Sequence, residues 1–72
     1  MSGSVYSVVE LIGSSTESWE QAASNAVKEA ARTYDDIRVA EVVEMDVMIE
    51  DGAIIAFRTK LRLSHKRSVV TD

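Results

Sequence analysis

The 72-residue chain has no cysteine, a single histidine and no apolar run close to the length of a membrane span. Without cysteine there can be no disulfide bond and no thiolate metal site, and one histidine cannot build a histidine-rich site. A spanning helix needs about 18 apolar residues in succession, so none is predicted. Chains this short have a small buried core, and their folded state usually needs further stabilisation by a metal or by association between copies. We therefore expect self-association first and a carboxylate-bound metal second.

Positive charge is also scarce. Twelve acidic and eight basic residues give a net charge of −4, which argues against non-specific nucleic-acid binding because such binding needs a basic surface. Residues 1–4 have neither the basic region nor the apolar core of a secretory signal. We therefore expect a cytoplasmic protein with no nucleic-acid partner and no membrane partner.

Three stretches have the side-chain alternation of β-strands: residues 5–12, 37–49 and 53–63. The segment Glu-Asp-Gly at residues 50–52 predicts a three-residue hairpin turn between the second and third strands. The second and third strands are each about twice as long as the usual five to six residues. Strands of this length in so small a domain favour contacts beyond one protomer.

A helix is predicted over residues 16–33 because apolar residues recur there at helical spacing. Ser14 and Glu17 fit a capping box, with Ser15 or Thr16 as alternative N-caps. The apolar stripe is mostly alanine, so the helix can approach a sheet closely, and its single tryptophan is expected in the core. The stripe consists of Trp19, Ala22, Ala23, Ala26, Val27, Ala30, Ala31 and Tyr34.

The order strand, helix, strand, strand predicts an α+β protomer in which a three-stranded antiparallel sheet wraps around one helix. A single domain is expected over residues 1–72, with an ordered core at about 4–65 and a flexible tail at 66–72. His65 is expected to be exposed and inert. Enzyme signatures are missing: there is no phosphate-binding glycine loop, no cysteine nucleophile and no serine with a plausible base. We expect no catalytic activity.

Several segments together resemble one protein family. They are Val-Tyr-Ser-Val-Val-Glu-Leu-Ile-Gly-Ser-Ser at residues 5–15, Ser-Ser-Thr-Glu-Ser-Trp at 14–19, Ile-Arg-Val-Ala-Glu-Val-Val-Glu at 37–44 and Phe-Arg-Thr at 57–59. This arrangement is similar to that of the dodecins, small proteins that assemble into hollow dodecamers and bind flavins. The resemblance covers roughly residues 5–64. It implies a homododecameric, non-catalytic particle for ligand binding or storage.

The chain departs from the flavin-binding dodecins at two positions. The position of Val39 usually carries a tryptophan that stacks on the flavin ring, and stacking adds about 0.5–1.5 kcal/mol beyond area burial. The position of Arg58 usually carries a glutamine that bonds the flavin edge, and arginine can only donate. Flavin binding, of riboflavin or FMN, in an altered pocket is therefore the alternative function. The changes favour a divalent cation as the ligand.

Three carboxylates are the candidate cation ligands: Glu17, Glu44 and Asp46. Glu17 and Glu44 fall on positions that resemble divalent-cation ligands of some dodecins, and Asp46 lies two residues from Glu44 on one predicted strand face. Ca²⁺ and Mg²⁺ prefer several oxygen ligands, so water or a second subunit would supply the rest. The segments Ser-Trp-Glu-Gln-Ala-Ala and Asp-Asp-Ile-Arg-Val-Ala look most like the calcium dodecins, which lack the tryptophan.

Ion pairing without any ligand is a competing interpretation of the same residues. A three-residue turn would place Glu44 opposite Arg58, where the two charges would form a cross-strand pair. Arg58, Lys60 and Arg62 form a basic stripe, interpreted as either an anion-binding surface or a salt-bridged face. A structural particle with no small ligand is a third possibility, and it would be perturbed by neither chelators nor flavins.

Overall fold

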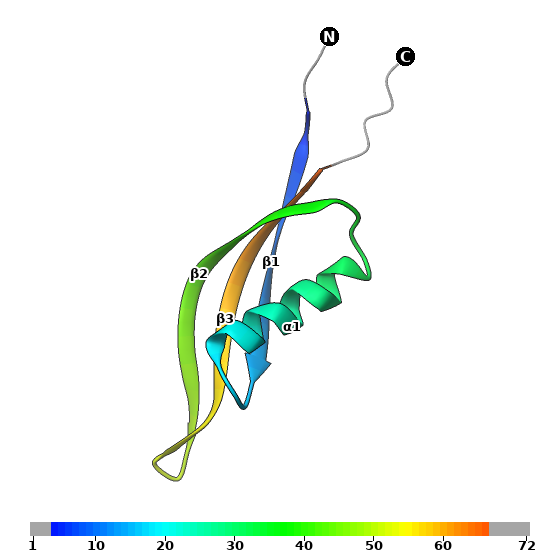
Figure 1. Cartoon of the computed structure of the whole chain (residues 1–72). Coiled ribbons are helices and arrows are strands. Elements are labelled where there is room, and N and C mark those ends of the chain that lie inside the picture. Colours follow the sequence, from blue (N-terminus) through cyan, green and yellow to red (C-terminus); the bar gives the residue numbers. More distant parts are fainter. Residues whose placement is uncertain (1–3, 67–72) are drawn as a thin grey trace.

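The computed structural model describes residues 4–66, which form a three-stranded antiparallel sheet with one helix against it (Figure 1). In chain order the elements are β1 (Tyr6–Ser15), α1 (Trp19–Ala31), β2 (Ile37–Glu50) and β3 (Ala53–Lys66). Strand β3 lies in the centre of the sheet, between β1 and β2. The predicted α+β class and the order of the elements are confirmed.

Helix α1 begins later than the sequence predicted. Ser18, rather than Ser14, Ser15 or Thr16, is its N-cap, and the Ser18 hydroxyl accepts a hydrogen bond of 2.9 Å from the Gln21 amide. Ser14 and Ser15 instead end strand β1, and the Ser15 hydroxyl accepts a bond from the Glu17 amide. The predicted capping box was therefore wrong. The helix of 13 residues is not long and apolar enough to cross a membrane.

Gly13 is the point of closest approach between α1 and β1. A Cβ atom at this position would overlap the carbonyl oxygen of Ala22 and lie 3.0 Å from the Ala26 Cβ. The first strand was predicted to end at residue 12, just before Gly13, but it runs on to Ser15. Gly13 is thus a contact residue, because only a residue without a side chain leaves room for the helix backbone.

The core lies between α1 and the centre of the sheet. Ala22, Ala26 and Ala30 are buried on the helix, and Leu61 and Leu63 are buried on β3. Val9 and Leu11 of β1 are partly buried against this cluster. Because the helix contributes mostly methyl groups, the core is thin and the helix lies close to the sheet; this close approach was predicted from the alanine stripe.

The β2–β3 hairpin turns over two residues rather than three. Glu50 pairs with Ala53, and Asp51 and Gly52 between them have φ values of 52° and 77°. Positive φ at both central residues is the geometry of a tight hairpin turn, for which Asp-Gly is a favoured sequence. Irregularities in the register follow near Met48 and Val43. The shorter turn and the first irregularity together place Asp46, not Glu44, opposite Arg58.

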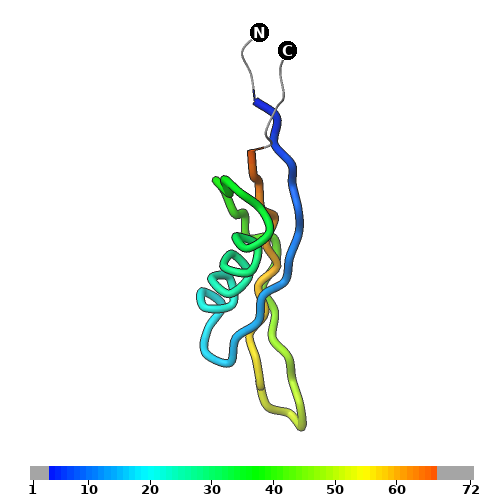
Figure 2. Tube along the Cα trace, turned by 90° about the vertical axis from the view of Figure 1, so that its right-hand side faces the viewer, coloured from blue at the N-terminus to red at the C-terminus, as the bar shows by residue number. Residues whose placement is uncertain are grey.

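The far end of this hairpin projects beyond the rest of the protein (Figure 2). Strand β1 ends where Ser15 pairs with Phe57, so residues 48–56 form a two-stranded ribbon, which we call the arm. The molecule measures 59 × 19 × 14 Å, with a radius of gyration of 15.3 Å. A compact domain of this length would have a radius of about 11 Å. The chain is therefore strongly elongated.

His65, at the opposite end of the sheet, is not exposed as the sequence predicted. This residue lies within β3, paired with Ser7 and Ile37, and its half-buried ring lies 4.6 Å from the ring of Tyr34. Lys66 also belongs to β3, so the ordered segment extends past the predicted boundary at residue 65. The rest of the predicted tail, residues 67–72, lies outside the described residues.

Candidate functional site

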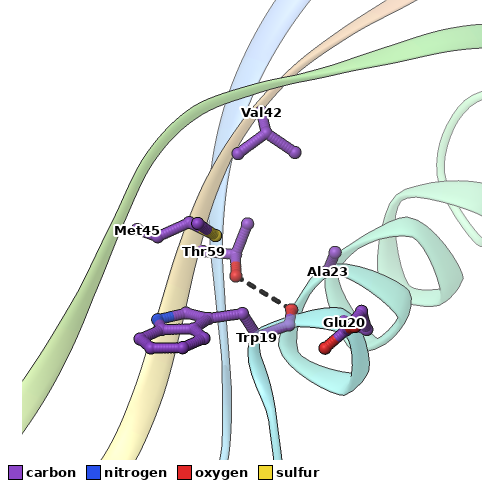
Figure 3. A pocket seen from close by; sticks show the side chains of 6 residues that line it. All are labelled: Trp19, Glu20, Ala23, Val42, Met45 and Thr59. Carbon is purple, nitrogen blue, oxygen red and sulfur yellow. Dashed lines mark hydrogen bonds between the residues drawn. The ribbon is translucent and has the colours of Figure 1, made fainter.

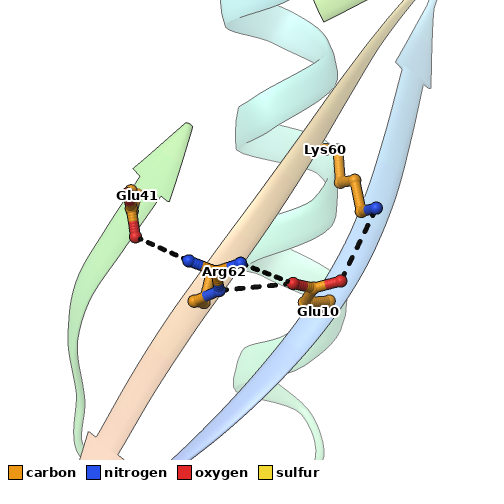
Figure 4. A network of polar contacts seen from close by, with 4 residues as sticks. All are labelled: Glu10, Glu41, Lys60 and Arg62. Atoms are coloured by element: carbon orange, nitrogen blue, oxygen red, sulfur yellow. Dashed lines mark hydrogen bonds and ion pairs between the residues drawn. The ribbon is translucent and has the colours of Figure 1, made fainter. Parts of the chain in front are cut away.

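The sheet face away from α1 carries the basic stripe of β3. Arg62 donates to Glu10 through Nε at 3.2 Å and Nη2 at 3.0 Å, and its Nη1 lies 3.4 Å from Glu41 Oε1. Lys60 Nζ lies 3.6 Å from the other carboxylate oxygen of Glu10 (Figure 4). The Arg62 hydrogen bond, followed by the charge of Lys60, lowers the pKa of Glu10. This part of the stripe is a salt-bridged face.

Arg58, the third member of the stripe, is paired with Asp46. Arg58 Nε donates to Asp46 Oδ1 at 2.8 Å, and Nη2 donates to Oδ2 at 2.7 Å. Both carboxylate oxygens are thus engaged in a bidentate pair, which lowers the pKa of Asp46 and raises that of Arg58. The predicted Glu44–Arg58 pair is wrong, since Glu44 faces Lys60 in the register.

The candidate cation ligands do not converge within one chain. Glu17 is exposed in the connection between β1 and α1, and Glu44 is exposed on β2. Among residues 4–66, no three histidine or acidic side chains are grouped closely enough to hold a metal ion. Asp46 is already bound by Arg58. The assignment of these three residues to a cation stays a prediction, and it requires further oxygen ligands from water or from another copy.

Val39 and Arg58, which occupy the family's flavin-contact positions, are also far apart within one chain. Val39 is exposed and pairs with Ser64, six residues along β3 from Arg58. At 3.3 Å per residue, six residues correspond to about 20 Å. The two positions therefore do not form one pocket within a single chain.

On the other face of the sheet, the structure shows a pocket that the sequence did not predict. It has a volume of about 300 Å³ between the start of α1 and the edge strand β2 (Figure 3). Its lining is almost wholly apolar and consists of Trp19, Glu20, Ala23, Val42, Met45 and Thr59. We call this pocket the groove.

Trp19 forms one wall of the groove and is held from three sides. Its indole Nε1 donates to the carbonyl oxygen of Asp46 at 2.9 Å, and its carbonyl oxygen accepts a bond of 2.9 Å from the Thr59 hydroxyl. Phe57 packs against the indole ring edge to face, with 5.0 Å between ring centroids. The prediction that Trp19 lies in the core is therefore wrong: its ring packs onto the sheet but is only half-buried, and one side of it faces the groove.

The groove was not predicted, because strict alternation along residues 37–49 puts Val42 and Met45 on opposite faces of the second strand. In the structure Val42 pairs with Leu61 and Met45 with Thr59, and both partners are buried on the helix side. The irregularity at Val43 inserts an extra residue in β2 and so brings both side chains to one face. A strict alternation of residues gives no signal for such an insertion.

Comparisons with known proteins agree on one family. The family profile described as Dodecin matches residues 5–67. A curated relative, calcium dodecin from Mycobacterium tuberculosis, is 49% identical over 63 residues, which cover 88% of this chain and 89% of the relative.

Solved structures of dodecins match the fold as well. The calcium dodecin of M. tuberculosis, described as a calcium-chelating antigen with a novel calcium-binding site, matches with 45% identity and a TM-score of 0.81 over 94% of this chain and 97% of its own. The dodecin of Streptomyces coelicolor matches with 31% identity and a TM-score of 0.90 over 97% of this chain and 100% of its own.

Proposed function

This chain belongs to the dodecin family, and we propose that it is a non-catalytic storage or ligand-binding particle, a homododecamer that binds calcium. The observation that carries the choice of ligand is the 49% identity to a relative named calcium dodecin, over nearly nine-tenths of both chains. Glu17 and Glu44 are the proposed ligands, because both are exposed and neither is held in an ion pair among residues 4–66. Asp46 could coordinate the cation as well only if its ion pair with Arg58 were broken.

Flavin binding is the alternative, and the geometry around Arg58 makes it less favourable. The guanidinium group already donates two hydrogen bonds to Asp46, so a flavin edge would have to compete with a bidentate ion pair. The exposed side chain at the other contact position, Val39, is aliphatic and offers no ring for stacking. A titration of riboflavin or FMN separates the two functions, since stacking on the protein would quench the flavin fluorescence.

Thermal unfolding with and without calcium tests the proposed ligands. A ligand that binds only the folded state at 100 times its dissociation constant stabilises by about 2.7 kcal/mol. The wild-type protein should therefore melt higher in calcium than in chelator. The double variant Glu17→Gln/Glu44→Gln should lose this difference, because an amide has no charge to attract the cation.

The matched control is Asp35→Asn/Glu50→Gln, which removes the same charge from two other exposed carboxylates that are held in no ion pair among residues 4–66. It should keep the calcium-dependent rise in melting temperature. An equal rise in all three proteins would show that calcium acts elsewhere. The absence of a rise in the wild type, together with quenching of riboflavin fluorescence, would replace calcium by flavin as the ligand.

A further inference from the structure

Arg58 is a positive charge close to two of the three candidate cation ligands. In the β2–β3 register Asp46 pairs with Arg58. Glu44 pairs with Lys60, two residues further along β3 on the same face of the sheet. Two residues along a strand correspond to about 7 Å. Both carboxylates raise the pKa of Arg58, Asp46 through hydrogen bonds and its charge and Glu44 through its charge.

We infer that Arg58 is a built-in competitor of the divalent cation for Asp46, and that it thereby sets the affinity of the protein for calcium. A guanidinium group and a metal ion need the same carboxylate oxygens, so Asp46 becomes a ligand only when Arg58 leaves it. Arg58 is then a residue that determines which carboxylates the cation can use. The inference rests on the proposed function, because it concerns the calcium ion assigned there to Glu17 and Glu44.

Arg58 engages both carboxylate oxygens of Asp46. Oδ1 accepts a hydrogen bond of 2.8 Å from Nε, and Oδ2 accepts one of 2.7 Å from Nη2. A calcium ion binds carboxylate oxygens at about 2.3–2.6 Å, so at either oxygen it would meet the positive charge of the guanidinium group. The hydrogen bonds from Arg58 lower the pKa of Asp46. They therefore stabilise the same deprotonated form that a metal ion requires.

Contacts on the helix side of the sheet hold the two partners in place. The indole Nε1 of Trp19 donates to the backbone carbonyl oxygen of Asp46 at 2.9 Å. The same ring packs against Phe57, which precedes Arg58 in β3. The backbone on both sides of the ion pair is thus fixed to the start of α1, and little ordering is needed to form the pair. Its bidentate geometry places it at the strong end of the range for surface ion pairs.

The competition predicts a measurable change in calcium affinity when Arg58 is removed. The apparent affinity for a ligand is reduced by the fraction of the protein that is competent to bind it. A surface ion pair at the strong end of its range shifts such an equilibrium by about fivefold. Loss of the guanidinium group should therefore lower the calcium dissociation constant by about the same factor. Loss of a positive charge alone also favours a cation, so the control must remove a charge without freeing Asp46.

Four variants separate these effects. Arg58→Met removes the charge and the donors but keeps an unbranched side chain. Lys60→Met is the matched control, because it removes a positive charge opposite Glu44 and leaves the pair of Asp46 intact. Asp46→Asn/Arg58→Met removes both partners and so keeps the net charge of the wild type. Arg58→Lys keeps the charge but loses the bidentate geometry, and it serves as the test variant if circular dichroism shows that Arg58→Met does not fold.

Isothermal titration of each protein with calcium chloride, after removal of bound metal by a chelator, measures the dissociation constant. Arg58→Met should bind calcium about fivefold more tightly than the wild type, and Arg58→Lys should lie between the two. Lys60→Met and the double variant should stay close to the wild type, since neither has a free carboxylate at position 46.

Three results would overturn the inference. An unchanged dissociation constant in Arg58→Met would show that the ion pair does not compete with calcium. An equal gain in Lys60→Met would assign the effect to charge alone, and a gain that persists in Asp46→Asn/Arg58→Met would show that calcium does not use Asp46. In all three cases binding of calcium by the wild type leaves the proposed function in place, whereas the absence of binding in every protein would remove both.

Discussion

The contact at Gly13 allows a quantitative test of how α1 packs on the sheet. The substitution Gly13→Ala adds one methyl group where the structure has the backbone carbonyl of Ala22, and the nearest side-chain atom is the Ala26 Cβ at 3.0 Å. A carbonyl in the middle of a helix cannot move alone, so α1 as a whole must shift away from β1. The shift would loosen the contacts of the buried alanines with Leu61 and Leu63.

Two opposing effects set the size of the change. Overpacking a well-packed site costs about 1–3 kcal/mol, and a clash with backbone belongs at the upper end of that range. Replacing glycine by alanine inside a strand returns about 0.5–1 kcal/mol of conformational entropy. The net loss should be about 2 kcal/mol. For a domain of 60–100 residues this lowers the melting temperature by about 8–16 °C, at about 4–8 °C per kcal/mol.

Urea unfolding followed by far-ultraviolet circular dichroism would measure this loss. All proteins should be compared at one chain concentration, because association makes apparent stability depend on concentration. Ser14→Ala is the control, since Ser14 is the exposed neighbour in the same strand, and exposed substitutions usually stay within about 0.5 kcal/mol. A Gly13→Ala protein as stable as the wild type would refute the close approach of α1 to β1.

Two further predictions concern the polar contacts. The pKa values of Glu10 and Asp46 are lowered from 4.5 and 3.8. Both carboxylates should therefore stabilise the fold at pH values above 4.5 and lose this contribution as the pH falls through their lowered pKa values. A urea midpoint that falls below pH 4.5 equally in the wild type and in Glu10→Gln/Asp46→Asn would contradict this. Trp19→Phe keeps an aromatic ring but removes the bond to the Asp46 carbonyl and part of the packing against Phe57, so it should cost at least about 0.5–1.5 kcal/mol in urea unfolding. No loss would mean that the bond contributes nothing.

The elements could be predicted from the sequence because each has its own periodicity. Alternation identified the strands, and the alanine stripe identified both the helix and its buried face, where Ala22, Ala26 and Ala30 lie. Such patterns depend only on which residues share a face, and these faces hold in the structure wherever the strands are regular. The order of elements and the fold class therefore followed from local information.

The register of the hairpin could not be predicted in the same way. It depends on the two-residue turn at Asp51 and Gly52 and on irregularities near Val43 and Met48. The Asp-Gly pair is a recognisable turn signal, but neither Val43 nor Met48 differs from an ordinary strand residue. An error of one residue in the turn and one in the ladder was enough to predict Glu44 as the partner of Arg58, where the structure has Asp46.

The same small residues that build the core also create the uncovered surface. Alanines on α1 and the bare backbone at Gly13 let the helix lie close against β1 and β3, and the helix makes far fewer contacts with β2. Strand β2 is thus left at an edge with the helix-side residues Val42 and Met45 uncovered. Larger side chains on this helix face would hold α1 farther from the sheet and would cover more of β2. The thin core and the open groove therefore have one cause, the small side chains on the face of α1 that meets the sheet.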